Sequence, residues 1–374
     1  MPATQPESRK ALHALLELIG EIDERFLGAE WGIEASDDVA EGTHALLHLL
    51  QGGLYTCYED DGDHPRFRRI VSPTRKFTGD NADAIYFDSA VNPRRAYRVR
   101  GEIAGAVYVS LTVESGAQDG RFGSQTAGAI NDTEFDVASD GTFEIYFGGP
   151  ARERNWVALG NDASRITTRH YFERKTSAAA DPTVRIRLEI DALGESAPAP
   201  PRPDDRSVSE GIHRVINFVR SRTLDMGPPG TRQQPPFVSI EPNRFPPPTP
   251  PGDFALAATD AAYSMAPFVL GPEEALVING RWPKCRFASV ALWTRYLQTF
   301  DYANRQVSLN RAQTVLDADG NFEMVLSHRD PGVDNWIETE GRPFGMVFWR
   351  YMLPEGDIET PQARVVPLSE LSGG

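Results

Sequence analysis

The sequence predicts a mainly β protein with two tandem lobes, each a jelly roll or β-sandwich, that arose by internal duplication. Three observations support this fold class. One stretch occurs twice, at residues 131–172 and 310–352. Short runs rich in β-branched and aromatic residues recur between glycine-containing turns, as in sandwiches. These runs do not alternate with helices, which argues against a doubly wound parallel sheet.

The two copies of the repeat share their turns and their aromatic positions. The shared residues are Asp140-Gly141 and Asp319-Gly320, Asn155-Trp156 and Asn335-Trp336, and Tyr171 and Tyr351. Because both lobes need them, we interpret these positions as scaffold. The glycines would adopt the positive φ of a hairpin turn, the tryptophans would fill the core, and the asparagines would bond nearby backbone.

The duplication extends further towards the N-terminus. Residues 83–86 correspond to 260–263 at an offset of 177, and residues 96–101 correspond to 275–280 at an offset of 179. Each lobe therefore spans about 100 residues, with about six short strands.

The N-terminal part of the chain predicts helices. Residues 8–27 place leucines and isoleucines at helical spacing, with Ser8 as a cap. A second helix is expected over residues 37–50, with Ser36 as its cap and Gly52-Gly53 as its stop.

A proline-rich connector separates the lobes. Residues 198–251 contain 14 of the 29 prolines, which excludes a central strand there. One amphipathic helix is expected within the connector, at residues 207–223. The predicted organisation is an N-terminal helical segment (1–64), a first β lobe (65–195), the connector with its helix (196–251) and a second β lobe (252–374).

Composition restricts the partners of the protein. The 374 residues exceed one ordinary core, and 40% of them are hydrophobic, as in a folded, soluble protein. The net charge of -15 argues against binding to nucleic acid or an anionic membrane. No run approaches the roughly 20 apolar residues of a membrane helix. Two cysteines and the absence of a visible secretory signal lead us to expect a cytoplasmic protein.

Several segments are similar to the DUF1254/DUF1214 proteins. Residues 79–101 resemble their opening strand, with the Asn-Ala-Asp-x-x-Tyr pattern at 81–86. The second lobe is similar to the DUF1214 domain, most specifically over residues 310–352. Its matching residues are Phe287-Ala288-Ser289-Val290, Asn304-Arg305, Asp319-Gly320, His328 to Gly332, Asn335-Trp336 and Trp349-Arg350-Tyr351.

The resemblance implies tandem all-β, jelly-roll-like lobes over about residues 65–372. It implies no activity and no catalytic residue, because the family is named for lacking an assigned function. The sequence departs from the family at strand 288–294, which lacks a Tyr-Asp ending. It also departs at Tyr302-Ala303, where a proline-containing turn is usual before Asn304. Both departures weaken the expectation of a ligand pocket near Asn304 and Arg305.

Metal and cofactor sites are not expected. His44 and His48 have a spacing that could present two imidazoles, but no glutamate lies between them. The acidic run at 59–64 lacks the spacing of a calcium loop. Gly123-Ser124-Gln125 only weakly resembles a nucleophile elbow, and no glycine-rich phosphate loop is present.

Polar positions that differ between the copies are freer to carry function. Lys76, Asp80 and Asn81 cluster just before a first-lobe strand and have no equivalents in the second lobe. Lys76 and Asp80 are the candidate catalytic residues, since a lysine and a carboxylate can serve acid-base chemistry. The alternative is a surface loop with a salt bridge.

Four residues are candidates for binding a ligand. Arg350 aligns with His170 on the last strand, and Arg305 has no counterpart in the first lobe. Asn81 and Tyr86 complete the set.

Three hypotheses for function follow. In the first, the protein binds or transforms a small, partly apolar molecule in a cleft. In the second, it is a non-enzymatic structural module that forms a homo-oligomer. The third is a carbohydrate-active sandwich with two carboxylates in a groove. The sequence leaves open whether the protein is an enzyme.

Overall fold

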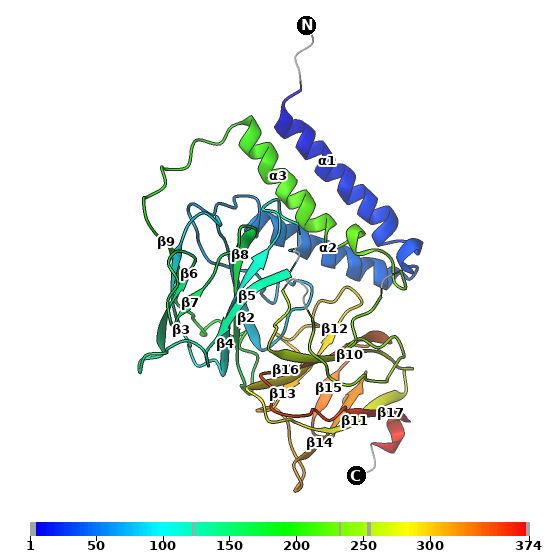
Figure 1. Ribbon diagram of the computed structural model, residues 1–374. Coiled ribbons are helices and arrows are strands. Elements are labelled where there is room, and N and C mark those ends of the chain that lie inside the picture. Colours follow the sequence, from blue (N-terminus) through cyan, green and yellow to red (C-terminus); the bar gives the residue numbers. More distant parts are fainter. Residues whose placement is uncertain (1–4, 122, 124, 232, 253–255, 372–374) are drawn as a thin grey trace.

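The computed structural model describes residues 5–371, apart from 122, 124, 232 and 253–255. Figure 1 shows two β lobes with three long helices gathered at one end of the molecule. Four sheets are divided between the lobes, which confirms the predicted mainly β, two-lobed fold class. No described helix is long and apolar enough to cross a membrane.

The three long helices come from two distant parts of the chain, and short helical turns accompany them or lie near the C-terminus. They are α1 (Glu7–Glu21), the π-helical turn η1 (Ile22–Phe26), the 3-10 turn η2 (Ala29–Trp31), α2 (Ser36–Thr56), α3 (Asp205–Arg220), and the 3-10 turns η3 (Leu224–Met226) and η4 (Leu368–Glu370). Helix α3, from the connector, lies beside α1, and α2 lies between this pair and the lobes (Figure 1).

Each lobe contains one run of strands. The first lobe has β1 (Arg68–Arg69), β2 (Ala84–Ala90), β3 (Tyr97–Glu102), β4 (Tyr108–Ser115), β5 (Gln125–Asn131), β6 (Thr142–Phe147), β7 (Trp156–Val157), β8 (Ala163–Tyr171) and β9 (Leu188–Ala192). The second lobe has β10 (Ala261–Val269), β11 (Glu274–Arg281), β12 (Phe287–Trp293), β13 (Ser308–Asn310), β14 (Asn321–Ser327), β15 (Trp336–Glu338), β16 (Phe344–Met352) and β17 (Gln362–Pro367).

The two lobes have the same sheet topology. The inner sheets have the orders β1-β2-β8-β4-β5 and β10-β16-β12-β13. The outer sheets have the orders β7-β6-β3-β9 and β15-β14-β11-β17. Apart from the short β1, every strand of one lobe has a counterpart in the other.

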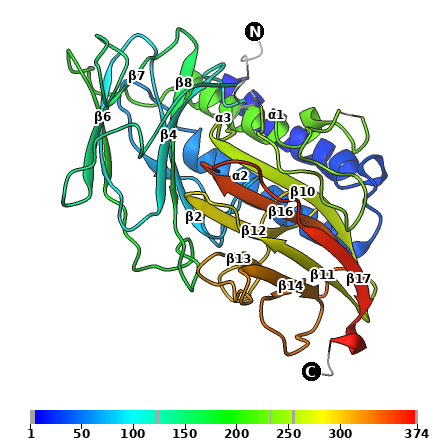
Figure 2. The same ribbon diagram turned by 60° about the horizontal axis from the view of Figure 1, so that its bottom comes forward.

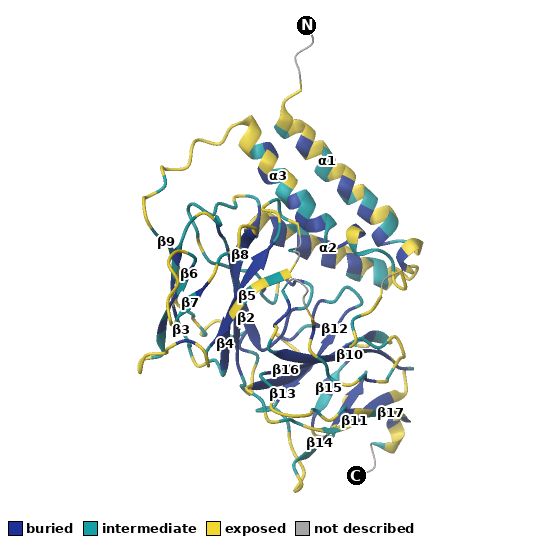
Figure 3. Cartoon of the chain, in the orientation of Figure 1, coloured by how far each residue is buried: buried dark blue, intermediate teal, exposed yellow. Residues whose placement is uncertain are grey.

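Three large cores hold the layers together. One core lies between the two sheets of the first lobe, and a second lies mainly between those of the second lobe. The third is shared: side chains of both inner sheets meet apolar side chains of all three long helices. The central strands of the inner sheets are therefore buried on both faces, whereas the edge strand β5 is partly exposed (Figures 2 and 3).

The predicted scaffold asparagines take identical roles in both lobes. Asn155 and Asn335 have φ of 53° and 54°. Each side-chain oxygen accepts a backbone N–H, from Asp136 at 2.9 Å and from Val315 at 2.7 Å. Each amide also donates to a backbone oxygen of the strand beside it. The predicted backbone bonding of both residues is confirmed.

The prediction that the paired tryptophans fill the core is wrong. Trp156 and Trp336 are only half-buried, and each indole N–H donates at 2.9 Å, to Gly148 O and to Ser327 Oγ. They lie on β7 and β15, the short edge strands of the outer sheets, where one face remains near solvent.

We predict that Asn335→Ala lowers the free energy of unfolding by about 3 kcal/mol, from lost side-chain bonds and left-handed strain. Asn335→Gly loses the same side-chain bonds but avoids the left-handed strain. It should therefore lower the free energy of unfolding by about 1 kcal/mol less than Asn335→Ala does. Urea denaturation monitored by fluorescence measures both. Equal losses in the two variants would contradict the assigned role of the left-handed φ.

Two helix predictions need correction. Helix α2 continues through Gly52 and Gly53 to Thr56 instead of stopping there. These glycines allow α3 to approach closely, since a Cβ on Gly53 would lie 3.0 Å from the Phe218 ring. Ser36 is the first residue of the helix, and no side chain caps its N-terminus.

Ser8 does not cap α1. Its hydroxyl donates at 2.5 Å to Asp205, the first residue of α3. Asp205 also accepts the backbone N–H groups of Glu7 and Ser8. The start of α1 is therefore satisfied by a side chain from α3.

Candidate functional site

The register of the inner sheets shows which positions of the two lobes are equivalent. Tyr86 lies opposite Arg169, and Tyr263 lies opposite Arg350. Arg350 is therefore the counterpart of Arg169. The predicted alignment with His170 is wrong by one residue, and a shift of one residue moves a side chain to the other face of a sheet. His170 faces the outer sheet, where its ring lies 3.2 Å from Glu102 O.

One row of residues, which runs across neighbouring strands, has the same four residue types in both inner sheets. It reads Tyr86, Arg169, Ser110, Asn131 in the first lobe and Tyr263, Arg350, Ser289, Asn310 in the second. Residues shared by both lobes are explained by a shared structural need, and the hydrogen bonds between the lobes identify it.

The asparagines of this row connect the lobes reciprocally. Asn310 donates to Asp83 of the first lobe at 2.9 Å. Asn131 donates to Asp260 of the second lobe, also at 2.9 Å. Tyr108 adds a second hydrogen bond to Asp260, at 2.6 Å. Each lobe thus supplies an aspartate that the other lobe binds.

Arg350 also lies at the lobe interface. It is 5% exposed, and its Nη1 donates to the hydroxyls of Tyr86 at 2.9 Å and Tyr171 at 2.6 Å. Its Nη2 donates to Gly79 O, so the guanidinium binds three groups of the first lobe. Burial raises the pKa of Tyr86, so Tyr86 remains a neutral hydroxyl.

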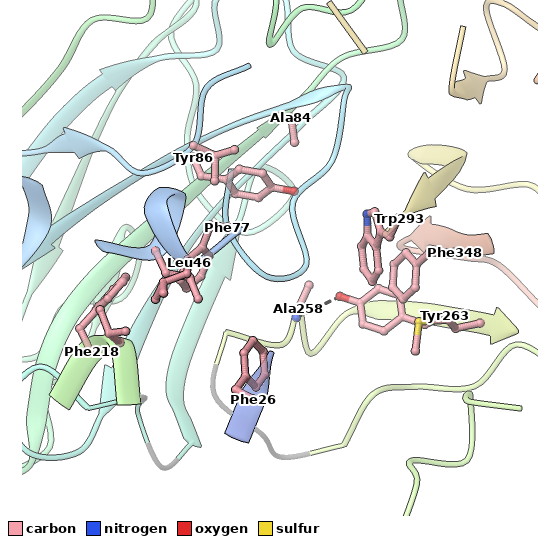
Figure 4. Packing of buried hydrophobic residues seen from close by; sticks show 14 of the residues in the cluster. Phe26, Leu46, Phe77, Ala84, Tyr86, Phe218, Ala258, Tyr263, Trp293 and Phe348 are labelled. Carbon is pink, nitrogen blue, oxygen red and sulfur yellow. Dashed lines mark hydrogen bonds between the residues drawn. The ribbon is translucent and has the colours of Figure 1, made fainter. Parts of the chain in front are cut away.

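The next two rows differ completely between the lobes. The first lobe has Asp88, Thr167 and Thr112, followed by Arg165 and Glu114. At the equivalent positions the second lobe has Met265, Phe348 and Ala291, followed by Met346 and Trp293. In the second lobe the indole of Trp293 stacks on Phe348 at 4.1 Å and fills this space (Figure 4).

In the first lobe these polar rows line a cavity of about 50 Å³. Its floor is the inner sheet, its walls include Phe77 and Phe218, and Cys57 and Leu256 contribute further apolar surface. Figure 4 shows the Phe77 and Phe218 rings close together on the side of the helices.

An ion-pair network forms one side of the cavity. Arg165 binds Asp88 at 2.6 Å through Nη2 and also pairs with Asp60. Burial raises the pKa of Asp88, and the attraction of Arg165 opposes this rise. Glu114 is held by Thr112 at 2.8 Å, by Thr126 and by the backbone N–H of Leu256.

Two buried oxygen atoms of residues that line the cavity have no hydrogen-bond partner among the described residues. They are Asp88 Oδ1 and Thr167 Oγ1. Asp88 is 7% exposed and Thr167 is 3% exposed, and they lie directly opposite each other on β2 and β8. Because an unsatisfied buried polar atom costs about 1–3 kcal/mol, this pair is a candidate position for a hydrogen-bonding water molecule or ligand.

The predicted catalytic pair lies elsewhere. Lys76 donates to the backbone oxygens of Thr299, at 2.5 Å, and Phe300. Asp80 accepts the N–H and the hydroxyl of Thr299 at 2.8 and 2.5 Å. Burial raises the pKa of Asp80 and lowers the pKa of Lys76. Both side chains hold the loop between β12 and β13 against the first lobe.

The predicted ligand-binding residues do not share one site. Asn81 donates to Ser289 at 3.1 Å, and Tyr86 and Arg350 bind each other at the lobe interface. Arg305 is far more exposed and pairs with Glu338. None of these residues is among those that line the cavity.

Among the residues that line the cavity, only Asp60 and Gly123 belong to candidate site motifs considered above, and neither motif predicted a site. The expectation that function lies where the copies differ does select the polar residues of the inner sheet once the register is right. The offsets of 177 and 179 already align Asp88 with Met265 and Glu114 with Trp293. A comparison of the strands along their whole length would have found both differences.

No group of three or more potential ligands is arranged to hold a metal ion within the described part of the chain. The rings of His44 and His48 are 4.2 Å apart, and His48 Nδ1 lies 3.0 Å from the Gln298 side-chain oxygen. The weak nucleophile motif includes residue 124, which lies outside the described residues.

The fold and the cavity define a two-lobed β-sandwich protein with a polar cavity in its first lobe. Residues 275–355 match the family described as "Protein of unknown function (DUF1214)", which confirms the resemblance of the second lobe.

Two of the solved structures that resemble this chain cover most of its length. An uncharacterized protein from Burkholderia cenocepacia is 25% identical, with a TM-score of 0.82, and the match covers 96% of this chain and 97% of that one. The VPA0106 protein from Vibrio parahaemolyticus is 12% identical, with a TM-score of 0.47, over 86% of this chain and 100% of that one. No curated protein matches the chain.

Proposed function

We propose that the protein binds a small, neutral molecule with a hydroxyl group and a short apolar part in the cavity of the first lobe. The observation that carries this proposal is the opposed pair of Asp88 Oδ1 and Thr167 Oγ1. One hydroxyl of a ligand can donate to Asp88 and accept from Thr167, because directly opposite residues of a sheet lie about 5 Å apart.

The charges of the cavity favour a neutral ligand. Its lining includes three carboxylates and three guanidinium groups: Asp60, Asp88, Glu114, Arg121, Arg165 and Arg222. The two aspartates share Arg165, and Glu114 accepts several hydrogen bonds. A charged ligand would therefore compete with bonds that already exist.

The size and the apolar walls limit the rest of the ligand. A volume of about 50 Å³ has room for the equivalent of about four water molecules, at roughly 10–15 Å³ each. The rings of Phe77 and Phe218 offer contact to a few carbon atoms. Short alcohols, diols and hydroxy-amides fit this description, whereas sugars and nucleotides are too large.

We predict that at least one member of a library of hydroxylated metabolites with up to six non-hydrogen atoms binds the wild-type protein. Thr167→Val should weaken binding about tenfold, since it removes one hydrogen bond worth about 1.4 kcal/mol. Asp88→Asn should weaken binding as much, because Arg165 retains the amide oxygen and the amide N–H₂ then faces the ligand. Ligand-observed saturation-transfer NMR measures these affinities.

Thr168→Val is the matched control. Thr168 is the next residue of β8, is equally buried and also lacks a hydroxyl partner, but it faces the outer sheet. Its substitution should leave the affinity unchanged. Equal weakening by both threonine variants, or no binding by wild type across the library, would contradict the proposal.

A further inference from the structure

The outer sheets carry a groove at the same place in both lobes. The groove of the second lobe has a volume of about 600 Å³ and that of the first lobe about 590 Å³. Eight lining positions correspond at a constant offset of 179, from Arg100 and Asn279 to Glu144 and Glu323. The duplication therefore provides an internal comparison for this surface, as it does for the cavity.

The groove of the first lobe is neutralised by arginines. Each of its four carboxylates forms an ion pair: Glu102 with Arg187, Asp136 with Arg154, Glu144 with Arg98, and Glu189 with Arg100. Arg100 lies at the centre of the row, opposite both Glu144 and Glu189. This surface has little charge left for a partner.

The groove of the second lobe is acidic. Its four carboxylates are exposed and form no ion pair within 4 Å among the described residues: Asp317, Glu323, Asp334 and Glu359. Asp317 already accepts hydrogen bonds from the backbone N–H groups of Asp319 and Asn321 and from the Asn321 side chain. No lysine or arginine is part of its lining. The central Arg100 is replaced by Asn279, which lies opposite Glu323 and Gln362. The nearby Arg364 pairs with Val277, two residues from Asn279 along β11, and is not among the residues that line the groove.

An aliphatic rim accompanies these charges. Val315 and Leu316 are 50% and 46% exposed, and Val333 contributes to the opposite side. The equivalent of Val315 in the first lobe is Asp136, so the apolar pair belongs to the second lobe alone. Adjacent exposed aliphatic side chains in a groove are a feature of surfaces that contact a partner.

We propose that the acidic groove of the second lobe docks an extended, lysine- or arginine-rich segment of another protein that also carries an aliphatic residue. The three carboxylates other than Asp317 would bind the cationic side chains, and Val315 and Leu316 would contact the aliphatic one. Complementary charge selects this occupant, because the lobe's own cation at the centre of the groove has been replaced by Asn279. The groove lies on the outer sheet, so docking there is independent of the cavity.

The test uses a fluorescein-labelled nine-residue peptide that alternates lysine and serine around a central leucine. Fluorescence anisotropy should detect binding to the full chain at 50 mM NaCl and at least tenfold weaker binding at 300 mM. Asn279→Arg, which recreates the arrangement of the first lobe, should weaken binding at least tenfold. Leu316→Ser should weaken binding several-fold and leave the salt dependence unchanged.

Val137→Ser is the matched control, because Val137 occupies the position of Leu316 in the first lobe. It should have no effect. Equal binding by wild type and Asn279→Arg would overturn the proposal and assign the attraction to the overall charge of the chain. No binding at 50 mM NaCl would also overturn it. If the protein forms a dimer without peptide, and Asn279→Arg dissociates that dimer, the occupant of the groove is a second copy of the chain and the proposal is overturned.

Discussion

Replacing Asp260 with alanine is expected to lower the free energy of unfolding by about 3–5 kcal/mol. The carboxylate accepts hydrogen bonds from Tyr108 at 2.6 Å and Asn131 at 2.9 Å, both from the other lobe. Tyr108 is completely buried and Asn131 nearly so. Two unsatisfied donors would then remain at the lobe interface, which is why the expected loss is large.

A double-mutant cycle isolates the contact between the lobes. Asn131→Ala alone should cost less than Asp260→Ala, and the two together should be less destabilising than their sum by about 1–2 kcal/mol. Guanidinium denaturation measures each variant, with the exposed Asp357→Ala as a control that should remain within about 0.5 kcal/mol of wild type. Strict additivity would contradict the direct bond.

Replacing Asp83 with asparagine is expected to stabilise the protein in a pH-dependent way. Burial raises the pKa of Asp83 from 3.8 to about 7, and Asn310 offsets this only in part. The second carboxylate oxygen has no partner among the described residues. An asparagine can accept the same bond from Asn310 without carrying a charge.

The direction of the effect follows from where the proton is held. Between about pH 4 and 7 the folded state retains the proton of Asp83 and the unfolded state releases it. The stability that this carboxyl contributes is complete below pH 4 and is lost as the pH rises towards 7, by about 1.4 kcal/mol per unit. Above pH 7 the loss is complete.

The measurement is the difference in unfolding free energy between Asp83→Asn and wild type from pH 4 to 8. It should begin near zero and reach about 4 kcal/mol in favour of the variant by pH 7.5. Other groups, such as His170, whose pKa burial lowers to about 4, titrate in both proteins and cancel in the difference. A difference that does not change with pH would contradict the raised pKa of Asp83.

Much of the architecture is readable from local patterns. Alternating apolar residues, Asp-Gly turns and a repeated Asn-Trp pair were enough to predict two equivalent β lobes. The roles of Asn155 and Asn335 were predictable because a left-handed turn makes a local demand that few side chains meet. The ends of α2 were not, since Gly52 and Gly53 are explained by the approach of α3, about 165 residues away.

The candidate site depended on the register of distant strands. Aligning Tyr171 with Tyr351 placed Arg350 on the wrong face, because the last strand of the second lobe is displaced by one residue relative to that match. With the observed pairing, Arg350 becomes part of the shared interface. Asp88, Thr167, Arg165 and Glu114 then appear as the polar replacements of an apolar layer.

The repeated stretch that predicts the fold also underlies the proposed function: residues that the lobes share hold them together, and the proposed binding sites lie where the lobes differ. The sequence by itself determined the duplication, the fold class and the scaffold turns, since periodicity and turn chemistry act within a few residues. Only the tertiary structure decided which side chains meet in the cavity and the grooves. Those contacts depend on strand register and on lobe and helix packing, which bring together residues from distant parts of the chain.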